Sequence, residues 1–248
     1  MYLQTPRVAV IPPCRLRLDL VLFALCIAVF ATFPDIDLRI SALFYNPVTD
    51  HWPLKDWIGI EIIYRLFAKI HILILLVLIP LAWHCRRRYT ATRQKWLYSF
   101  LLASILVGPG IVSHVILKDN SIGRARPNDI VEFGGQDRFT SPFSYSGECR
   151  KNCSFVSGHA AIGFYFVGLG WLTGSAWGYY IGVVIGAIVG GTRILQGGHF
   201  LSDVVFAFWV VHFCNLWLSR RFQLAHPLGE PVSLSGALWR RLRPSAQN

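Results

Sequence analysis

Charged side chains are scarce in this sequence. They make up 15% of its 248 residues, against 54% for hydrophobic residues, whereas soluble domains have about 25% charged residues. The sequence also lacks internal repeats, low-complexity tracts and a second polar segment of domain size. These absences exclude an ordinary soluble fold and predict one integral-membrane domain over residues 1–248.

Acidic residues are the scarcest charged group. The chain has 13 of them against 24 lysines and arginines, which gives a formal net charge of +11. A basic balance can indicate a nucleic-acid partner. Here, however, most basic residues flank long apolar runs. We therefore interpret the excess of basic residues as a signal that sets the orientation of the helices in the membrane, and we expect no nucleic-acid binding.

Apolar runs, by contrast, are long and frequent. A helix crosses the ~30 Å hydrocarbon layer in about 20 residues. Six runs approach or reach this length: Leu18–Phe33, Ile58–Trp83, Trp96–Leu117, Ser157–Leu172, Ala176–Ile194 and Phe200–Leu218. The first is short enough for a signal peptide, but no small-x-small cleavage site follows it, so we expect a retained helix. The sequence therefore predicts an all-α bundle of six transmembrane helices.

Basic residues also orient this bundle. They cluster before the first helix, between the second and third, and after the sixth, as Arg7, Arg15, Arg17, Arg86, Arg87, Arg88, Arg93, Lys95, Arg220, Arg221, Arg240, Arg241 and Arg243. Lysine and arginine favour cytoplasmic loops. We therefore expect this side, with both termini, to be cytoplasmic, and the linker 34–57 and the loop 118–156 to lie on the opposite side.

Three polar clusters fall on that opposite side, each at a helix end. Together they contain the polar and charged side chains whose presence is not explained by a membrane-spanning role. They are "KDNSIGRARP" with Lys118, Arg124 and Arg126, "SFVSGHA" with Ser157, Gly158 and His159, and "TRILQGGHFLSD" with Arg193, His199 and Asp203. Because all three share one side of the membrane, we expect them to form one site.

The residue types in this site suit a phosphate group. His199 and Asp203 are four apart, so on a helix the carboxylate can orient the imidazole and raise its basicity. Backbone N–H groups at the start of the helix that begins near Ser157 and Gly158 provide an anion seat. Lysine and arginine side chains complete it, because phosphoryl transfer depends mainly on positioning and charge stabilisation.

The three clusters resemble the signature of the type 2 phosphatidic acid phosphatase superfamily, K-x6-RP, PSGH and SR-x5-H-x3-D. Arg193, His199 and Asp203 have the spacing of the third block, with Thr192 in place of serine, and Val156 replaces the proline of the second. In the first block seven residues separate Lys118 from Arg126, so Arg124 is a candidate to share the role of Lys118. The resemblance covers about residues 96–218, with the signature blocks within 118–203.

The resemblance implies hydrolysis of a phosphate monoester or pyrophosphate without a metal or other cofactor. It gives His199 the role of nucleophile, Asp203 that of its orienting partner, and His159 that of the acid for the leaving group. Lys118, Arg126, Arg193, Ser157 and Gly158 resemble the phosphate-binding residues. A zinc site built from His159, His199 and Asp203 is conceivable by residue type, but the surrounding cations would repel the metal.

The resemblance leaves the substrate open. "RARPNDIVEFGG" and "CRKNCSFVSGH" look most like the bacterial lipid A phosphatase branch, which implies a phosphorylated lipid partner and a bacterial inner-membrane enzyme with a periplasmic site. Phosphatidylglycerophosphate, phosphatidic acid and undecaprenyl pyrophosphate remain alternative substrates. The family also contains phosphotransferases and soluble vanadium haloperoxidases, and the membrane spans argue against the latter. A transporter that binds an anion without chemistry is the alternative outside the enzymes.

Two cysteines, Cys149 and Cys153, lie in the loop 118–156. The other four lie in or near helices and the expected cytoplasmic face. An oxidising periplasm favours a bond between Cys149 and Cys153, which would close a small loop just before Ser157. Two free thiols are the alternative.

Overall fold

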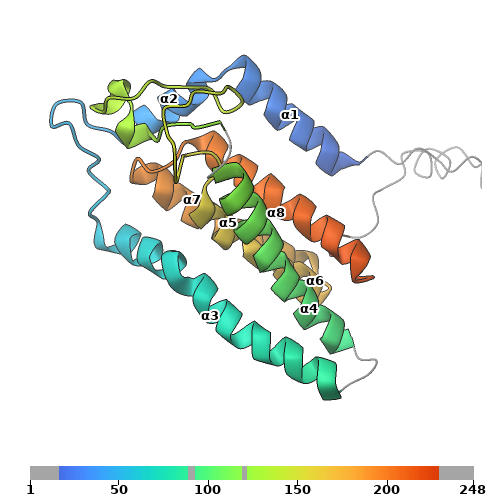
Figure 1. Cartoon of the computed structure of the whole chain (residues 1–248). Helices are drawn as coiled ribbons and strands as arrows, with labels where there is room; N and C mark the ends of the chain where they lie inside the picture. Colours follow the sequence, from blue (N-terminus) through green and yellow to red (C-terminus); the bar gives the residue numbers. More distant parts are fainter. Residues whose placement is uncertain (1–16, 89–92, 119–121, 229–248) are drawn as a thin grey trace, which may run out of the picture.

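The chain folds into helices joined by one long loop (Figure 1). The computed structural model describes residues 17–88, 93–118 and 122–228, and this part contains no β-strand. Its α-helices are α1 (Leu18–Thr32), α2 (Asp35–Ala42), α3 (Ile58–Arg88), α4 (Arg93–Ile105), α5 (Gly158–Phe164), α6 (Leu169–Thr173), α7 (Ala176–Leu195) and α8 (Leu201–Arg221). Leu106–Lys118 continues α4 as the π-helix η1, and η4 (Tyr165–Gly168) joins α5 to α6. Short 3-10 turns, η2 (Pro127–Asp129) and η3 (Val131–Phe133), lie in the loop.

Four described helical segments are long and apolar enough to cross a membrane. They are Ile58–Arg87, Lys95–Lys118, Ala176–Leu195 and Leu201–Arg221. A fifth results if α1 and α2, which meet at an angle of 82°, count as one span. The structure thus confirms an all-helical membrane protein with four to five candidate spans. The run expected to be the fourth of six spans, Ser157–Leu172, is the shorter and mostly buried series α5, η4 and α6.

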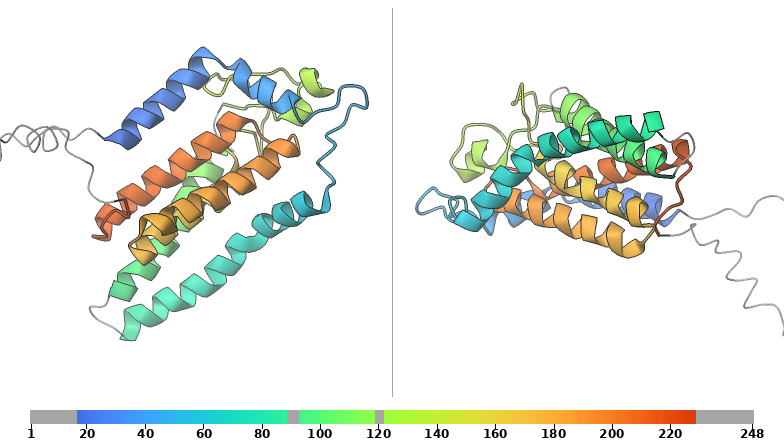
Figure 2. Two further views of the ribbon diagram at one scale, coloured as in Figure 1. Left: turned by 180° about the vertical axis from the view of Figure 1, so that it is seen from behind. Right: turned by 90° about the horizontal axis from the view of Figure 1, so that it is seen from below.

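The buried α5–η4–α6 series packs against α7 and α8, and α3 lies at one edge of the bundle (Figures 1 and 2). Gly182 and Gly186 of α7 allow this close packing, since a Cβ on Gly186 would lie 2.0 Å from the Phe164 ring. Small residues at helix contacts are typical of membrane bundles. At the opposite edge, the Phe23 ring of α1 packs 5.5 Å from that of Trp209 on α8.

The linker 34–57 is not merely a connection. It contains α2, which lies across one end of the bundle beside the loop 122–157 (Figure 1). We call this end, where α5 and α8 begin and α7 ends, the site end. The basic residues expected in 1–16 and 229–248, which are Arg7, Arg15, Arg240, Arg241 and Arg243, lie outside the described residues. Arg86, Lys95 and Arg221 lie at the other end of the bundle.

Candidate active site

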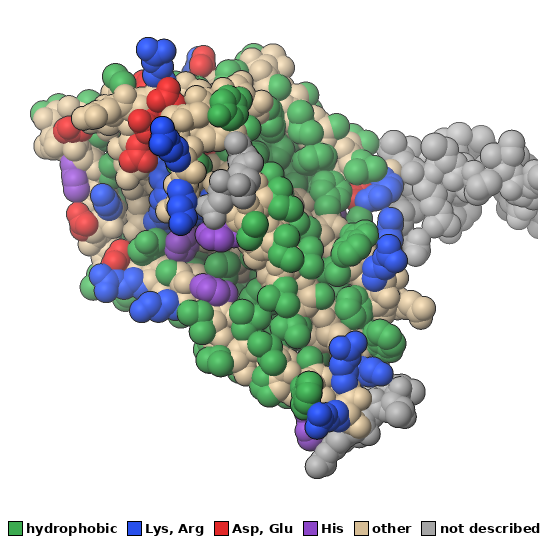
Figure 3. Space-filling view, in the orientation of Figure 1, with side chains coloured by type: hydrophobic (Ala, Val, Ile, Leu, Met, Phe, Trp, Pro, Cys, Tyr) green, Lys and Arg blue, Asp and Glu red, His purple; other side chains and the backbone are tan. Residues whose placement is uncertain are grey.

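The three polar clusters meet at the site end. Backbone hydrogen bonds join them in pairs: Asn128 N–H donates to Gly197 O at 3.0 Å, and Ser157 N–H donates to Asp203 O at 3.1 Å. Ser154 N–H donates to Arg124 O at 2.9 Å. Figure 3 shows histidines, lysines and arginines gathered with acidic side chains at this end, whereas hydrophobic side chains cover much of the rest of the face. The clusters therefore form a single site, as their positions in the sequence predicted.

Asp203 sits in the first turn of α8 and is fully buried. Its Oδ2 accepts hydrogen bonds from Phe200 N–H at 2.8 Å and from the Ser154 hydroxyl at 2.5 Å. The same oxygen lies 3.5 Å from Nδ1 of His199. His199 precedes the helix instead of lying within it, so the pair meets across the helix start. This arrangement leaves Nε2 as the imidazole nitrogen that faces away from Asp203.

His199 is held in its neutral form. Burial lowers its pKa to about 3, opposed by the Asp203 carboxylate and reinforced by the charges of Lys118 and Arg193. Both ring nitrogens are buried without a hydrogen-bond partner among the residues that the structure describes. Buried polar atoms normally have partners. A neutral imidazole with an available Nε2 lone pair, beside two cations, has the properties of a nucleophile toward an anionic phosphoryl group.

Arg124 connects the dyad to α2. Its Nη1 donates to Asp203 Oδ1 at 2.7 Å and its Nη2 to Asp37 Oδ2 at 2.8 Å. Asp37 also accepts from the backbone N–H of Ser202 at 2.9 Å. Arg124 and both carboxylates are fully buried. The sequence suggested a phosphate-binding role for Arg124, but its guanidinium is directed at carboxylates and fixes Asp203.

Asp37 was missed in the sequence because it lies in a segment that we expected to be a linker. A local signal exists in "PDIDLR", where Pro34 is followed by two aspartates. Proline and acidic residues are favoured in the first turn of a helix. This signal predicts a short helix but says nothing of its place, and the contact between Asp37 and Arg124 depends on tertiary packing.

Tyr64 of α3 is a second residue that the sequence did not indicate. Its ring stacks on that of His159, with centroids 4.9 Å apart and planes at 26°. The Arg193 guanidinium carbon lies 4.6 Å from the centroid of the same ring. Tyr64 therefore contacts both the expected acid and an expected phosphate ligand. His159 Nε2 is buried with no hydrogen-bond partner in the described part of the chain.

The expected phosphate ligands converge on the start of α5. Ser157 caps this helix by accepting from Ala160 N–H at 3.4 Å. The Lys118 ammonium lies beside Gly158, since a Cβ built there would be 3.5 Å from Nζ. The charges of Lys118, Arg126 and Arg193 all act on the His159 side chain. The seven-residue spacing in the first block thus still brings Lys118 to the site.

The "QGG" turn is shaped around Arg193. A Cβ on Gly198 would lie 2.2 Å from Arg193 Nη2, so this backbone passes directly against the guanidinium. Gly197 has a φ of +65°, which ends α7 in the left-handed conformation that glycine favours. The side-chain oxygen of Gln196 accepts from Arg193 Nη1. The two glycines therefore let the chain turn tightly between the arginine and the dyad.

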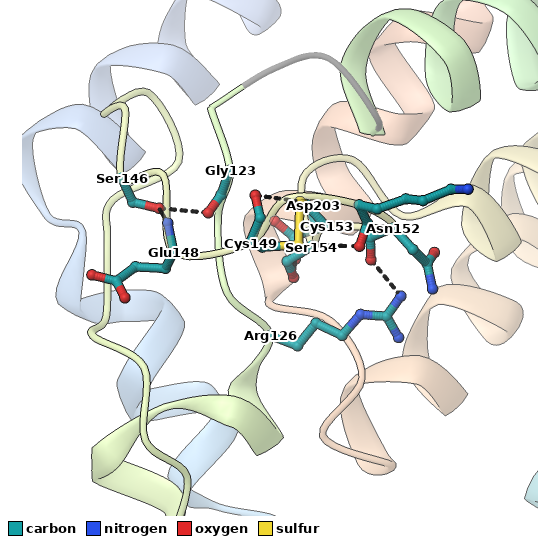
Figure 4. The surroundings of a disulfide bond; sticks show 10 residues. Gly123, Arg126, Ser146, Glu148, Cys149, Asn152, Cys153, Ser154 and Asp203 are labelled. Atoms are coloured by element: carbon teal, nitrogen blue, oxygen red, sulfur yellow. Dashed lines mark hydrogen bonds between the residues drawn. A yellow bond between two sulfur atoms is a disulfide. The ribbon is translucent and has the colours of Figure 1, made fainter.

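Cys149 and Cys153 form a disulfide in the structure, with Cα atoms 5.5 Å apart. Figure 4 shows the small ring that the bond closes beside Arg126. Within that ring, the carbonyl of Asn152 accepts from Arg126 Nη2 at 2.8 Å. The residue that follows the ring, Ser154, is the one that donates to Asp203. The ring therefore contacts Arg126, an expected phosphate ligand, and is joined to the dyad by the residue that follows it.

The described residues contain no group of three or more His, Cys, Asp or Glu placed to hold a metal ion. The site instead combines two histidines, a buried carboxylate and several cations. It can bind a tetrahedral anion, attack it with an imidazole and protonate a leaving oxygen.

Comparisons with known proteins identify the family of the chain. Residues 94–226, more than half of the chain, match the PAP2 superfamily model. The chain is 30% identical over 196 residues to the lipid A 4'-phosphatase of Francisella tularensis subsp. novicida (strain U112), covering 74% of this chain and 87% of that protein. It is 29% identical over 196 residues to the lipid A 4'-phosphatase of Rhizobium leguminosarum, covering 72% and 84%. No solved structure matches the chain. The chain belongs to the PAP2 superfamily and is a membrane phosphatase.

Proposed function

We propose that this phosphatase removes the 4'-phosphate of lipid A at the periplasmic face of a bacterial inner membrane, without a metal, through a phosphohistidine intermediate. The observation that carries the proposal is the buried pair of His199 and Asp203 beside Lys118 and Arg193. The choice of substrate is supported by the names of the two relatives, which share most of their length with this chain.

In the first step, the Nε2 lone pair of His199 attacks phosphorus and the bond to the lipid oxygen breaks. His159, in its imidazolium form, gives the proton on its Nε2 to that oxygen, so the lipid leaves as a neutral alcohol and the His159 ring becomes neutral. The bound anionic phosphate favours this protonated form, because it offsets the charges of Lys118, Arg126 and Arg193. Asp203 compensates the positive charge that develops on the His199 ring. The distance of 3.5 Å between Asp203 Oδ2 and His199 Nδ1 supports this role.

In the second step, His159 takes a proton from water and the resulting nucleophile attacks the phosphohistidine. The nitrogen–phosphorus bond breaks, inorganic phosphate leaves, and the neutral imidazole of His199 is restored. Lys118, Arg126 and Arg193, with the backbone at Ser157 and Gly158, bind the phosphoryl oxygens through both steps. Preorganised cations and N–H groups are suited to the charge that these oxygens carry in the transition state.

The periplasmic orientation and six membrane crossings are part of the proposal. At the end opposite the site, basic side chains lie over tryptophan rings: Arg87 over Trp83 at 4.1 Å, Lys95 over Trp96 at 5.5 Å, and Arg221 over Trp217 at 5.5 Å. Tryptophan is enriched at membrane interfaces, and lysine and arginine on the cytoplasmic side. These pairs support a cytoplasmic interface at that end and a periplasmic site at the other.

A side-by-side assay of purified protein in detergent tests the proposal. The substrates are lipid A, phosphatidylglycerophosphate, phosphatidic acid and undecaprenyl pyrophosphate, each with a metal chelator present. We expect lipid A to be hydrolysed fastest, with free inorganic phosphate as product. Fragmentation of the lipid product by mass spectrometry should show the phosphate missing at the 4'-position.

The alternatives give different results in the same assay. Loss of the 1-phosphate, or faster release from another lipid, would refute the choice of substrate. A phosphorylated acceptor in place of free phosphate would indicate a phosphotransferase. Binding of lipid A with no phosphate release from any substrate would indicate a transporter, and activity that returns only with a divalent metal would contradict the proposed chemistry.

A further inference from the structure

An apolar groove of about 400 Å³ lies between α3 and α7, near the site end. Its lining is formed by Leu54, Trp57, Ile60, Ile63, Ile188, Gly191, Thr192 and Leu195. The one hydroxyl among these side chains, that of Thr192, donates to Val189 O at 2.7 Å. It therefore needs no hydrogen-bond partner from a ligand in the groove. The volume lies within the range of about 300–1,000 Å³ that is common for ligand sites.

The groove adjoins the active site on both of its helices. On α7, Gly191 and Thr192 directly precede Arg193. On α3, Ile60 and Ile63 flank Tyr64. Tyr64 and Arg193 do not line the groove themselves, but they follow lining residues on both helices, and the Arg193 guanidinium carbon lies 4.6 Å from the centroid of the Tyr64 ring.

The groove also begins beside a residue type that favours the membrane interface. Trp57, 61% exposed, stands directly before α3, and tryptophan favours the membrane interface. From there the lining reaches Ile63, five residues into α3, which is about 8 Å along a helix axis. An acyl chain whose headgroup sits at the interface would enter the membrane over this same depth.

We propose that this groove binds an acyl chain of the lipid substrate while Arg193 holds the phosphate. The proposal rests on the proposed function, because it assigns the apolar part of the same substrate. It makes Gly191 a specificity-determining position, since a side chain there would occupy the space that the acyl chain needs. A Cβ at Gly191 has no heavy atom within 4 Å, so substitution is compatible with the fold.

The test is the variant Gly191→Leu, purified in detergent. Leucine is a better helix former than glycine, and at this position it projects into the groove. We expect its KM for lipid A to rise at least about tenfold, since several methylene groups lose their burial. Turnover of p-nitrophenyl phosphate, which has no acyl chain, should stay within about twofold of wild type.

The matched control is Ile181→Phe. Ile181 lies on the same helix and is 52% exposed, but it does not line the groove. We expect this variant to equal wild type on both substrates. As a second measurement, n-decyl phosphate should inhibit p-nitrophenyl phosphate hydrolysis more strongly than n-butyl phosphate in the wild type, and Gly191→Leu should reduce that preference.

Two results would overturn the groove proposal. One is an unchanged KM for lipid A in Gly191→Leu. The other is an equal loss on lipid A and on p-nitrophenyl phosphate, which would place the effect at Arg193. If wild-type protein releases phosphate from p-nitrophenyl phosphate but not from lipid A, the proposed substrate fails, while the inhibition by alkyl phosphates still tests the groove.

Discussion

Arg124 Nη1 and Asp203 Oδ1 lie 2.7 Å apart, and neither side chain is exposed. Arg124 therefore serves as the fixed counter-charge of the carboxylate that faces His199, the proposed nucleophile. Its other terminal nitrogen, Nη2, donates to Asp37 and so ties α2 to the proposed reaction centre, although none of the proposed phosphate ligands lies on α2.

We expect Asp37→Asn to lower kcat about tenfold with p-nitrophenyl phosphate while KM stays close to wild type. Removing one partner of a buried ion pair typically costs about 3–5 kcal/mol, and the displaced Arg124 would misplace Asp203. Asp37 itself does not contact the phosphate ligands. Steady-state kinetics and thermal unfolding in detergent provide the measurement. Asp35→Asn, at an exposed position of the same helix, is the control and should match wild type. A rise in KM with unchanged kcat would contradict the positioning role.

Substitution of His159 and substitution of His199 should block different steps of the reaction. With p-nitrophenyl phosphate the leaving group needs no proton, so His159→Ala should still release a burst of nitrophenol and accumulate phosphoprotein that is labile to acid and stable to base. His199→Ala should do neither, because it lacks the attacking nitrogen. Rapid-quench kinetics with denaturing gels reveals both products. Phosphoprotein in His199→Ala would mean that another residue is the nucleophile.

Acid should destabilise the folded protein through His199. Its pKa is about 3 when folded and about 6.5 in an unfolded chain, so the unfolded state binds more protons between these values. Stability is thus fully present above pH 6.5 and falls as the pH drops toward 3. Glutamine does not titrate, so the melting temperature of His199→Gln should fall less between pH 7 and pH 4 than that of wild type. Parallel curves for the two proteins would show that His199 titrates normally.

The disulfide should matter more for activity than for folding. Cys149→Ser frees the ring that positions the Asn152 carbonyl against Arg126. We expect a several-fold higher KM for p-nitrophenyl phosphate with a nearly unchanged yield of folded protein. Cys26→Ser, on α1, is the control. Mass spectrometry of alkylated, unreduced wild type must show Cys149 and Cys153 unlabelled, since two labelled thiols would rule out the bond.

Topology can be tested with alkaline phosphatase fusions, which are active only in the periplasm. A fusion after Gln136, in the loop at the site end, should be active. A fusion after Arg87, at the end where basic residues lie over tryptophans, should be inactive. The reverse pattern would place the active site in the cytoplasm and contradict lipid A hydrolysis at the periplasmic face.

The proposed site residues could be picked out from the sequence because they are polar or charged groups at the ends of apolar runs. A charged group is costly there, so its presence requires a functional explanation. The order and spacing of Arg193, His199 and Asp203 reduce the number of protein families that could provide that explanation. The runs themselves were also clear, and α1 and α7 end within one residue of their predicted limits. The structure adds how the three clusters are joined by hydrogen bonds.

The residues that were missed act through tertiary contacts. Asp37 is an ordinary aspartate in the first turn of a short helix, and Tyr64 is one of three Phe, Tyr or Trp residues on α3. Neither has a local pattern that reveals its role, because the partners Arg124 and His159 are far away in the sequence. The groove at Gly191 could not be predicted from the sequence for the same reason, since it is formed by the packing of two helices.

The contact between Asp37 and Arg124 also bears on how this protein can be divided. The family match begins at residue 94, whereas Asp37 stands 87 residues before Arg124. A chimaera joined at residue 94 would keep every signature residue and still lose one of the two carboxylates that neutralise the buried guanidinium. The segment with α1 and α2 must therefore be exchanged together with the catalytic half. Among related sequences, positions 37 and 124 should consequently covary, with a charge lost at one accompanied by a charge lost at the other.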